Sequence, residues 1–229
     1  KQMMSHRPNV ALTTGSLWEA FFRNVEKELM NGKKVDLSNA KMWIIGGEGT
    51  NPAYFKRWNE LMELCGSTTP LFSGYGMSEV FSVLSVETTE SAKEAKKNDT
   101  PVISVGVAYP GVNVKVVNEK GQEVKYGERG ELLIDSKAHM KGYYNKPSLT
   151  EKALIDGWVH TGDIFSIDEN GILYLWGRSD DSISLNDNKK LYMFDIANTI
   201  KLDKDNRTLT IEDNGIGMTD MELEDNLGT

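Results

Sequence analysis

The first half of the sequence alternates between short runs of β-forming residues and longer segments with helical periodicity. Strand-sized runs occur at residues 9–14, 41–45 and 70–73. The two segments between them carry apolar residues at the intervals of an amphipathic helix with one buried face. These residues are Leu17, Trp18, Phe21, Phe22, Val25 and Leu29 in the first segment and Phe55, Trp58, Leu61 and Met62 in the second. A strand-helix-strand-helix-strand order favours a parallel sheet covered by helices, and therefore an α/β fold.

Capping and stop signals flank the predicted helices. Ser16 and Glu19 have the spacing of a capping box, and Gly32 is a stop signal for the helix that they begin. Asn51 and Pro52 have the pattern of a helix cap followed by the first helical residue. We therefore expect the second helix to begin at Pro52.

The second half of the sequence changes character from about residue 100 onward. Short alternating runs there predict strands, and the Asp-Glu-Asn-Gly sequence at 168–171 predicts a tight hairpin turn, because glycine and asparagine accept positive φ angles. The predicted strands are 113–117, 130–134, 163–167 and 172–176. The charge-dense stretch at 87–99 lacks a long apolar face and predicts a surface loop or short helix. We expect a β-rich, barrel-like region after a helix-covered sheet.

Charge and hydropathy exclude several classes of partner. The 229 residues carry 26 basic and 34 acidic side chains, a formal net charge of -8, which provides no positive field for nucleic acid. No apolar run approaches the roughly 20 residues that cross a bilayer, and the first residues lack the apolar core of a signal peptide. We therefore expect a cytoplasmic protein with neither a nucleic-acid partner nor a membrane span.

Two glycine-rich loops follow predicted strands, where open α/β sheets place their ligands. Residues 46–49 (GGEG) allow the backbone to approach a flat ligand closely, although such clusters also serve as simple strand-to-helix turns. Residues 74–79 (GYGMSE) add an aromatic ring, a hydroxyl and a carboxylate, which suit a purine, a phosphate and hydrated Mg²⁺. A turn without a ligand is the alternative for this loop as well.

Polar residues in the β-rich half form a second group of candidates. Asp163 ends the run GWVHTGD, where its carboxylate can accept bonds from two ribose hydroxyls or merely cap a turn. His160 is considered as a general base, because an unperturbed imidazole titrates near neutrality, but the sequence shows no carboxylate partner for it, and we expect a structural or substrate-proximal role. Arg178 precedes Asp180 and Asp181, so it can bind an anion or ribose or form a salt bridge with either aspartate.

These elements occur together in the order and approximate spacing of one family. The segments GGEG, GYGMSE, GWVHTGD and GRSDDSI, with SVGVAYPGVNVKVV, residues 127–132 (GERGEL) and residues 140–144 (MKGYY) between them, resemble the adenylate-forming ligases over about residues 1–202. This superfamily comprises acyl-CoA synthetases, peptide-synthetase adenylation domains and luciferases. The resemblance implies an α/β portion of the large N-terminal domain at 1–99, its β-rich portion at 100–177, and a hinge with the start of a small C-terminal domain at 178–202.

The resemblance implies an enzyme that converts a carboxylic acid and ATP into an acyl-adenylate and then transfers the acyl group to a thiol. Coenzyme A is the expected thiol, and a carrier-protein thiol is the alternative. Ser78 is implied to contact phosphate and Glu79 to bind Mg²⁺, which makes them the candidate catalytic pair, while Asp180 is implied to be the hinge. The implied nucleotide-binding residues are Gly46, Gly47, Glu48, Gly74, Tyr75, Gly76, Asp163 and Arg178.

Several positions depart from the family pattern. Ser78 stands where the family usually has threonine, which keeps the hydroxyl. The family's phosphate loop ending in lysine and the lysine of its C-terminal domain have no counterpart in these residues. Ser184 replaces a common lysine, and residues 186–188 (NDN) replace the usual Ser-Gly. We therefore expect the chain to be incomplete for catalysis, and the alternative function is that of a non-catalytic nucleotide-binding or fusion fragment.

The last segment, 203–229, resembles a different family of ATP-binding proteins. Its run NRTLTIEDNGIGMT is similar to the GHKL ATPases, specifically the ninety-kilodalton heat-shock chaperones. That resemblance implies an adenine contact at Asp213, with Gly215 and Gly217 allowing close approach of the backbone. A solvated turn between a strand and an acidic helix is the alternative. A chaperone ATPase is the third function considered, because it rests on this segment alone.

Overall fold

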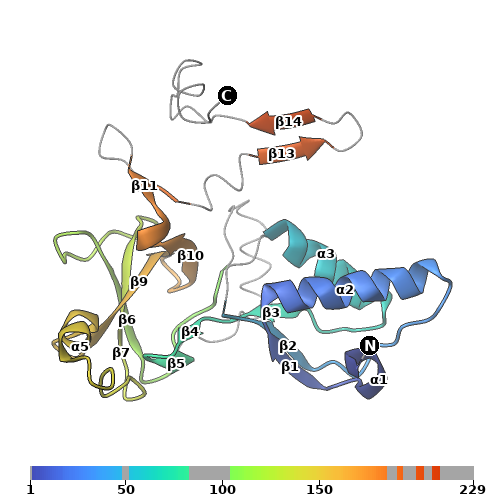
Figure 1. Cartoon of the computed structure of the whole chain (residues 1–229), viewed down its shortest axis with the longest axis horizontal. Coiled ribbons are helices and arrows are strands. Elements are labelled where there is room, and N and C mark those ends of the chain that lie inside the picture. Colours follow the sequence, from blue (N-terminus) through green and yellow to red (C-terminus); the bar gives the residue numbers. More distant parts are fainter. Residues whose placement is uncertain are drawn as a thin grey trace. The chain divides into compact units, whose positions relative to one another are not determined.

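The computed structural model describes residues 2–47, 52–82, 104–184, 190–192, 200–203 and 208–211. Contacts within the chain divide it into two compact units, Lys1–Asp180 and Asp181–Thr229. The described part contains no helix that is long and apolar enough to cross a membrane. The first unit holds an α/β region followed by a β-rich region (Figure 1), as the sequence predicts.

The α/β region is a three-stranded parallel sheet with helices on one face. After α1 (Gln2–His6), the sheet forms from β1 (Val10–Thr13), β2 (Met42–Ile45) and β3 (Leu71–Ser73), in the order β1-β2-β3. Helices α2 (Gly15–Met30) and α3 (Pro52–Leu64) connect consecutive strands and lie along the same face of the sheet (Figure 1). All three predicted strands and both predicted helices are confirmed, with each strand boundary within one residue of the expectation and the start of α3 at Pro52 as predicted.

Aromatic side chains make up the centre of this region. Trp43 of β2 stacks on Trp18 of α2 with their ring centroids 5.1 Å apart, and Trp58 of α3 stacks on Phe22 with a centroid distance of 5.9 Å. Trp18 donates its indole N–H to the carbonyl of Ile44, and Trp43 donates its own to the carbonyl of Pro8, both at 3.0 Å. The indoles are therefore buried without an unpaired donor, which is the usual requirement for tryptophan in a core.

Two details of α2 differ from the sequence-based expectation. Leu17 is 60% exposed, so the apolar face of the helix is narrower than its list of apolar residues indicates. The capping box is wrong: the cap is Thr14, which makes no side-chain capping bond, and Ser16 lies inside the helix. Glu19 instead accepts hydrogen bonds from Arg57 and Trp58 of α3, because these partners are within reach once the two helices pack. The predicted stop is correct, since α2 ends at Met30 and Gly32 has a φ of 72°.

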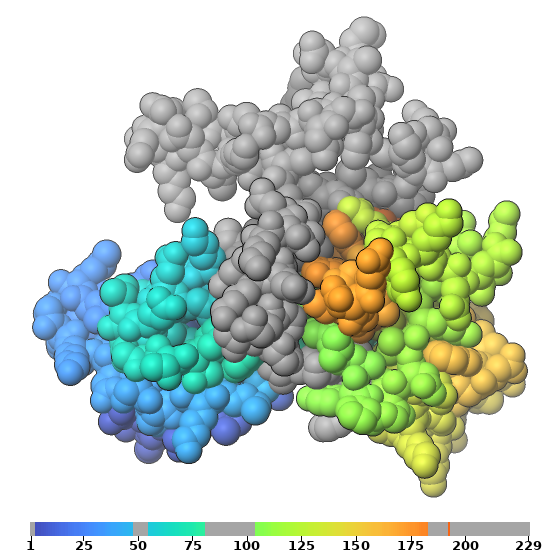
Figure 2. Space-filling model, turned by 180° about the vertical axis from the view of Figure 1, so that it is seen from behind, coloured from blue at the N-terminus to red at the C-terminus, as the bar shows by residue number. Residues whose placement is uncertain are grey.

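The β-rich region is an antiparallel sheet of five strands. Its order is β10-β9-β7-β6, with β8 paired to β9. Its elements are β6 (Asn113–Val117), β7 (Gly130–Asp135), α5 (Pro147–Ala153), β8 (Leu154–Ile155), β9 (Trp158–Ile167) and β10 (Leu173–Arg178). Figure 2 shows residues 104–184 as the atoms coloured green to orange. The fold class is therefore α/β with a β-rich second region, as predicted.

The core of the β-rich region also receives residues from the loop after β3. Tyr75 and Val80 belong to the same buried cluster as Val116, Ile134 and Phe165 of the sheet. Tyr75 immediately precedes the short hairpin of β4 (Gly76–Met77) and β5 (Phe81–Ser82), and Val80 is the last residue of the turn between these strands. The GYGMSE loop is thus anchored in the β-rich core by the residue before β4 and by the end of its turn.

The described residues of the second unit form two strand pairs. The 3-10 turn Ser179–Asp181 spans the boundary between the units and is followed by β11 (Ile183–Ser184), which pairs with β12 (Lys190–Leu191). Strand β13 (Ile200–Asp203) pairs with β14 (Thr208–Ile211). Both pairings are antiparallel and two-stranded.

Candidate functional site

Two of the predicted glycine loops meet where the parallel strands end. Gly46 follows β2 and donates its amide to the carbonyl of Thr13 at 3.1 Å, while Gly74 follows β3 and donates to Ile45 at 2.9 Å. A β-carbon added to Gly46 would lie 3.5 Å from the Gly74 carbonyl oxygen. Gly47 has a φ of 81°, which L-residues with a side chain rarely adopt. Backbone from both loops is therefore accessible at one edge of the sheet, and Glu48 lies outside the described residues.

Three predicted site residues from distant motifs form one hydrogen-bonded cluster. The Tyr75 hydroxyl donates to Asp163 Oδ2 at 2.5 Å, and Arg178 Nη1 donates to Asp163 Oδ1 at 3.0 Å. Tyr75 is largely buried, with its ring packed edge-to-face on Phe165 at 4.9 Å. Among the described residues, each oxygen of Asp163 accepts one hydrogen bond, and a carboxylate oxygen can accept a second. The cluster therefore retains acceptor capacity for two further donors.

The geometry of the β9-β10 hairpin sets Arg178 beside Asp163. The two residues are register partners, with Gly177 opposite Ile164 and Leu175 opposite Phe165, so that Trp176 forms a bulge. The preceding Gly162 has a φ of 70°, and a β-carbon there would lie 3.1 Å from Arg178 Nη2. Glycine at this position leaves the room in which the guanidinium reaches the carboxylate. The turn itself has the predicted form, since the Gly171 amide donates to the Asp168 carbonyl.

Burial dominates the electrostatics of the cluster. Burial raises the pKa of Asp163 above its ordinary value, and the hydrogen bonds from Tyr75 and Arg178 only partly oppose this. Burial likewise raises the pKa of the Tyr75 phenol, and the neighbouring Asp163 charge adds to the increase. Tyr75 therefore remains a neutral hydrogen-bond donor to Asp163 throughout the physiological pH range.

Ser78 and Glu79 lie in the turn of the β4-β5 hairpin. Ser78 is exposed, whereas the Glu79 carboxylate accepts a hydrogen bond from the Tyr143 hydroxyl at 2.6 Å. The Glu79 carbonyl accepts a second bond from the Met140 amide at 2.6 Å. The sequence pattern assigns no role to Tyr143, although the run MKGYY that contains it is one of the segments of the family resemblance.

His160 has a carboxylate partner that sequence reasoning missed. Its Nδ1 lies 3.2 Å from Oε2 of Glu131, and Oε1 of Glu131 accepts the amide of Gly162 at 3.0 Å. Glu131 lies on β7 and His160 on β9, and these strands are neighbours in the sheet. The partner was hidden because cross-strand neighbours are distant in sequence. Glu131 thus contacts both His160 and the backbone of β9 immediately before Asp163, which is consistent with a structural role for His160.

Arg178 also approaches the predicted hinge residue. Its Nη2 lies 3.8 Å from Oδ2 of Asp180, whose side chain is 83% exposed. The closer partner of Arg178 is thus Asp163 and not one of the aspartates that follow it in sequence. Asp213, Gly215 and Gly217 lie outside the described residues, so the GHKL-like expectation stays a prediction.

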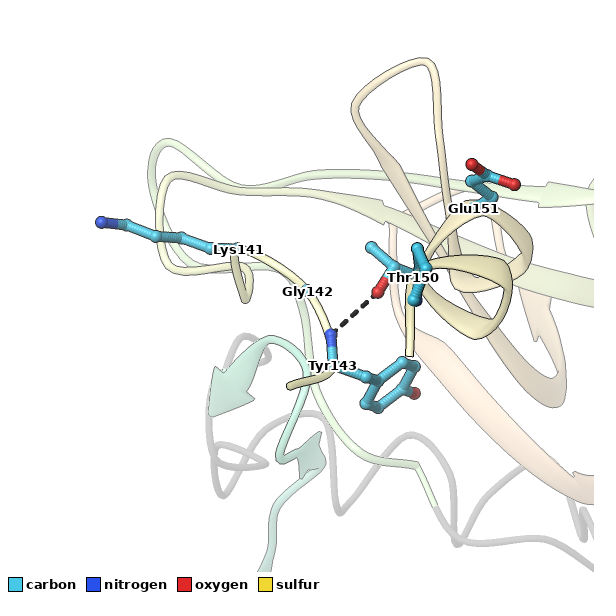
Figure 3. Close-up of a pocket in the computed structure, with 6 residues that line it drawn as sticks. Lys141, Gly142, Tyr143, Thr150 and Glu151 are labelled. Atoms are coloured by element: carbon cyan, nitrogen blue, oxygen red, sulfur yellow. Dashed lines mark hydrogen bonds between the residues drawn. The ribbon is translucent and has the colours of Figure 1, made fainter. Parts of the chain in front are cut away.

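A shallow hollow lies between the loop that contains Tyr143 and helix α5. It is lined by Lys141, Gly142, Tyr143, Pro147, Thr150 and Glu151 (Figure 3). None of the predicted site residues lines it. Across the described ranges, no group of three or more His, Cys, Asp or Glu side chains is arranged to hold a metal ion.

Known families and curated proteins match most of this chain. A family model described as AMP-binding enzyme matches residues 1–144. A long-chain-fatty-acid–CoA ligase of Haemophilus influenzae is 30% identical over 170 residues, which is 74% of this chain and 27% of that protein. The ligase of the same name from Salmonella typhimurium is 31% identical over 167 residues, or 72% of this chain and 27% of that protein. The chain thus spans about a quarter of the length of these ligases.

Solved structures share the fold over a larger part of the chain. The structure of McyG A-PCP complexed with phenylalanyl-adenylate matches with a TM-score of 0.74 at 19% identity, covering 91% of this chain and 40% of that one. The adenylation domain of a keto acid-selecting peptide-synthetase module bound to keto acyl adenylate matches with a TM-score of 0.71 at 23% identity, covering 85% and 40%. At such identities these matches establish the fold alone.

Proposed function

Because the chain belongs to the AMP-binding enzyme family, we propose that it is part of an AMP-forming acyl-CoA ligase. In the proposed reaction, a substrate carboxylate attacks the α-phosphate of ATP, pyrophosphate leaves, and an acyl-adenylate forms. A thiol then attacks the acyl carbon, and AMP leaves. Coenzyme A is the thiol that the names of the relatives favour, and a long-chain fatty acid is the first acid to test.

The Tyr75-Asp163-Arg178 cluster is the observation that carries this proposal. It brings one residue from each of three separate motifs to one point, and it is centred on the carboxylate of Asp163, a buried residue. A buried carboxylate with remaining acceptor sites suits the two hydroxyls of a ribose. Gly46, Gly47, Glu48, Gly74 and Gly76 are proposed to surround the adenine, with Ser78 near the phosphates.

The chain's residues fit a nucleotide-bound Mg²⁺ better than a protein-held metal. Mg²⁺ in nucleotide sites is usually held by one or two carboxylates together with substrate phosphates and water. Glu79 is a single carboxylate, and no metal-binding group of three ligands occurs among the described residues. When bound, the cation would neutralise charge on the phosphates. Glu79 is the proposed protein ligand, and its neighbours orient its carboxylate.

The boundary between the two compact units supports the proposed hinge. The first unit ends at Asp180 and the second begins at Asp181. Asp180 is highly exposed and makes its one described ion pair with Arg178 at a distance of 3.8 Å, so little restrains it. Rotation about this residue would let one nucleotide site serve two successive half-reactions.

Replacing the central carboxylate tests the nucleotide site directly. Asp163→Ala should weaken binding of ATP to the 229-residue chain by about 1.5 to 3 kcal/mol, roughly ten- to 150-fold, because it removes acceptors from two hydroxyls. Isothermal titration calorimetry measures the affinity, and Glu169→Ala in the exposed hairpin turn is the matched control. Equal affinities of Asp163→Ala and the wild type would remove Asp163 from the site.

Pyrophosphate exchange tests the chemistry. Incubation with ATP, labelled pyrophosphate and a panel of carboxylic acids should give label in ATP only when an acid that the enzyme accepts is present. ATP binding without acid-dependent exchange would identify the chain as the non-catalytic nucleotide-binding fragment. Hydrolysis of ATP that needs no acid would instead favour the GHKL-like tail as the working site.

A further inference from the structure

The loop after β7 holds Glu79 at two points. The Tyr143 hydroxyl donates to Oε1 of the Glu79 side chain, and the Met140 amide donates to the Glu79 backbone carbonyl, both at 2.6 Å. The side-chain bond joins residues that are 64 positions apart in sequence. The turn of the β4-β5 hairpin is therefore fixed to a loop of the β-rich region through both the backbone and the carboxylate of one residue.

The backbone of Tyr143 is hydrogen-bonded to α5. Its amide donates to Thr150 Oγ1 at 2.9 Å, the bond drawn in Figure 3, and the Thr150 hydroxyl donates to the Lys146 carbonyl at 3.1 Å. Gly142 has a φ of 144°, and a β-carbon there would lie 2.8 Å from Thr150 Cγ2. The close approach of the loop to α5 thus requires glycine at 142. The side chains of Lys141 and Glu151 point away from Tyr143.

This arrangement leaves one oxygen of Glu79 available. Tyr143 occupies Oε1, and among the described residues no donor bonds to Oε2. A carboxylate with one oxygen bonded by a neighbouring hydroxyl is restricted in rotation, and its second oxygen is then presented in one direction. Partners of this kind orient metal ligands in many sites, where they contribute substantially to metal affinity.

We propose that Tyr143 is a positioning residue for Glu79, which it holds so that Oε2 faces a nucleotide-bound divalent cation, and that Thr150 in turn positions Tyr143. This inference rests on the proposed function, because it needs Glu79 to contact the cation. Lys141 and Glu151 contribute no contact to the Glu79 carboxylate in this arrangement. The Tyr143 amide donates a hydrogen bond to the Thr150 hydroxyl, and the Tyr143 hydroxyl donates one to the Glu79 carboxylate.

The expected results differ if Tyr143 only links the hairpin to the loop, a role called here a structural brace, and does not position Glu79. A brace between the hairpin and the loop affects folding stability and nucleotide binding whether or not metal is present. A positioning residue affects the metal-dependent step alone. Affinity for Mn²⁺ in the ternary complex, compared with affinity for ATP in the presence of a chelator, therefore separates the two roles.

The experiment uses the 229-residue chain with ATP and Mn²⁺ as probes. Electron paramagnetic resonance of free Mn²⁺ gives its affinity for the chain-ATP complex, and calorimetry with a chelator gives the metal-free ATP affinity. Tyr143→Phe should weaken Mn²⁺ binding roughly three- to tenfold, the range of one lost hydrogen bond, and leave metal-free ATP affinity unchanged. Tyr144→Phe is the control, because this neighbouring tyrosine is 91% exposed.

Two further comparisons show whether Tyr143 acts through Glu79. Glu79→Gln should weaken Mn²⁺ binding more than Tyr143→Phe, and adding Tyr143→Phe to Glu79→Gln should produce no additional loss. Thr150→Val should weaken Mn²⁺ binding less than Tyr143→Phe does, whereas Thr150→Ser, which keeps the hydroxyl, should match the wild type.

The outcomes distinguish failure of this inference from failure of the proposed function. A wild-type chain that binds neither ATP nor ATP with Mn²⁺ overturns the proposed site, and this inference with it. A wild-type chain that binds both, with Tyr143→Phe equal to it in Mn²⁺ affinity, overturns the positioning role alone. Equal losses in Tyr143→Phe with and without metal also overturn it, because they identify a brace.

Discussion

Each of the two regions contains a mostly buried carboxylate, Glu19 in the α/β region and Asp163 in the β-rich region. Their surroundings shift the pKa values of these two side chains in opposite directions. Burial raises the pKa of Glu19 in α2, but hydrogen bonds from Arg23, Arg57 and Trp58 outweigh it and the net pKa is lowered. At Asp163 in β9, burial outweighs the bonds from Tyr75 and Arg178, and the net pKa is raised. Both side chains are mostly buried, at 17% and 11% exposed.

The difference fits a structural role for Glu19 and the proposed binding role of Asp163. Glu19 receives more donors than its burial requires, and it ties α2 to α3 in the region of the aromatic core. Asp163 receives fewer donors than its burial requires, so its negative charge is undercompensated until further donors arrive. Undercompensated polar groups in a protein interior are characteristic of functional sites. Under the proposed function, the carboxylate of the α/β region is structural, and the carboxylate of the β-rich region binds the ligand.

Removing a core indole should give the largest effect. Trp43→Ala should lower the free energy of unfolding by about 3 to 5 kcal/mol, because it deletes a fully buried ring stacked on Trp18. Urea unfolding followed by circular dichroism measures the loss. Trp158→Ala, a partly buried tryptophan of the β-rich region with Lys115 over its ring, is the control and should cost about 1 kcal/mol. Equal losses would contradict the division between the regions.

Neutralising Glu19 should give the next largest effect. Glu19→Gln should cost about 1.5 to 3 kcal/mol at pH 7, because it weakens bonds from two arginines and one indole. Since the folded pKa of Glu19 is lowered, its contribution is present above the ordinary glutamate pKa and is lost as pH falls through the folded value. Urea unfolding from pH 7 to pH 3 should show the gap closing, with the exposed Glu60→Gln as control. A gap independent of pH would refute this account.

Asp163→Asn should produce a smaller effect with the opposite pH dependence. Because the folded pKa of Asp163 is raised, ionisation destabilises the folded wild type as pH rises from the ordinary aspartate value of about 3.9 through the folded value. The Asn variant has no such group, so its stability relative to the wild type should increase across this window. The same urea series measures it. Parallel pH profiles for Asp163→Asn and Glu19→Gln would remove the contrast on which the comparison is based.

Deleting residues 204–229 should have the smallest effect. The described residues of this segment pair only with β13, and they belong to the second compact unit. The main thermal transition should shift by less than about 2 °C, and the ATP affinity should not change. Differential scanning calorimetry and titration calorimetry are the measurements. Loss of ATP binding, or ATP hydrolysis by the isolated segment, would transfer the working site to the GHKL-like tail.

Local patterns predicted the elements because their periodicity depends on nearby residues. The strand at 113–117 and the start of α3 at Pro52 agree with the structure to the residue. The capping box failed because Glu19 has stronger partners, Arg57 and Trp58, which lie 38 and 39 residues further along the chain. Sequence spacing alone contains no information about such partners.

The sequence predicts the residues of the candidate site, but it does not predict which of them form hydrogen bonds with one another. Asp163 and Arg178 were both singled out, and their flanking of the 168–171 turn is compatible with a hairpin that brings them together. The sequence did not indicate that Tyr75 would bond Asp163, or that Tyr143 would bond Glu79, because these contacts depend on how the loop after β3 packs on the β-rich sheet. Tertiary packing, and not residue type, decides such contacts.

The bulge at Trp176 decides which residue of β10 lies opposite Asp163. Before the bulge, Leu175 is opposite Phe165; after it, Arg178 is opposite Asp163. If the same residues paired without the bulge, Gly177 would lie opposite Asp163, and Arg178 would move to the other face of the sheet. The indole of Trp176 is anchored to Ser166 at 2.8 Å and covered by Arg129. In the evolution of this hairpin, a single-codon deletion of Trp176 would therefore keep the cation beside the carboxylate, whereas a change that flattens the bulge with every residue retained would put a glycine there.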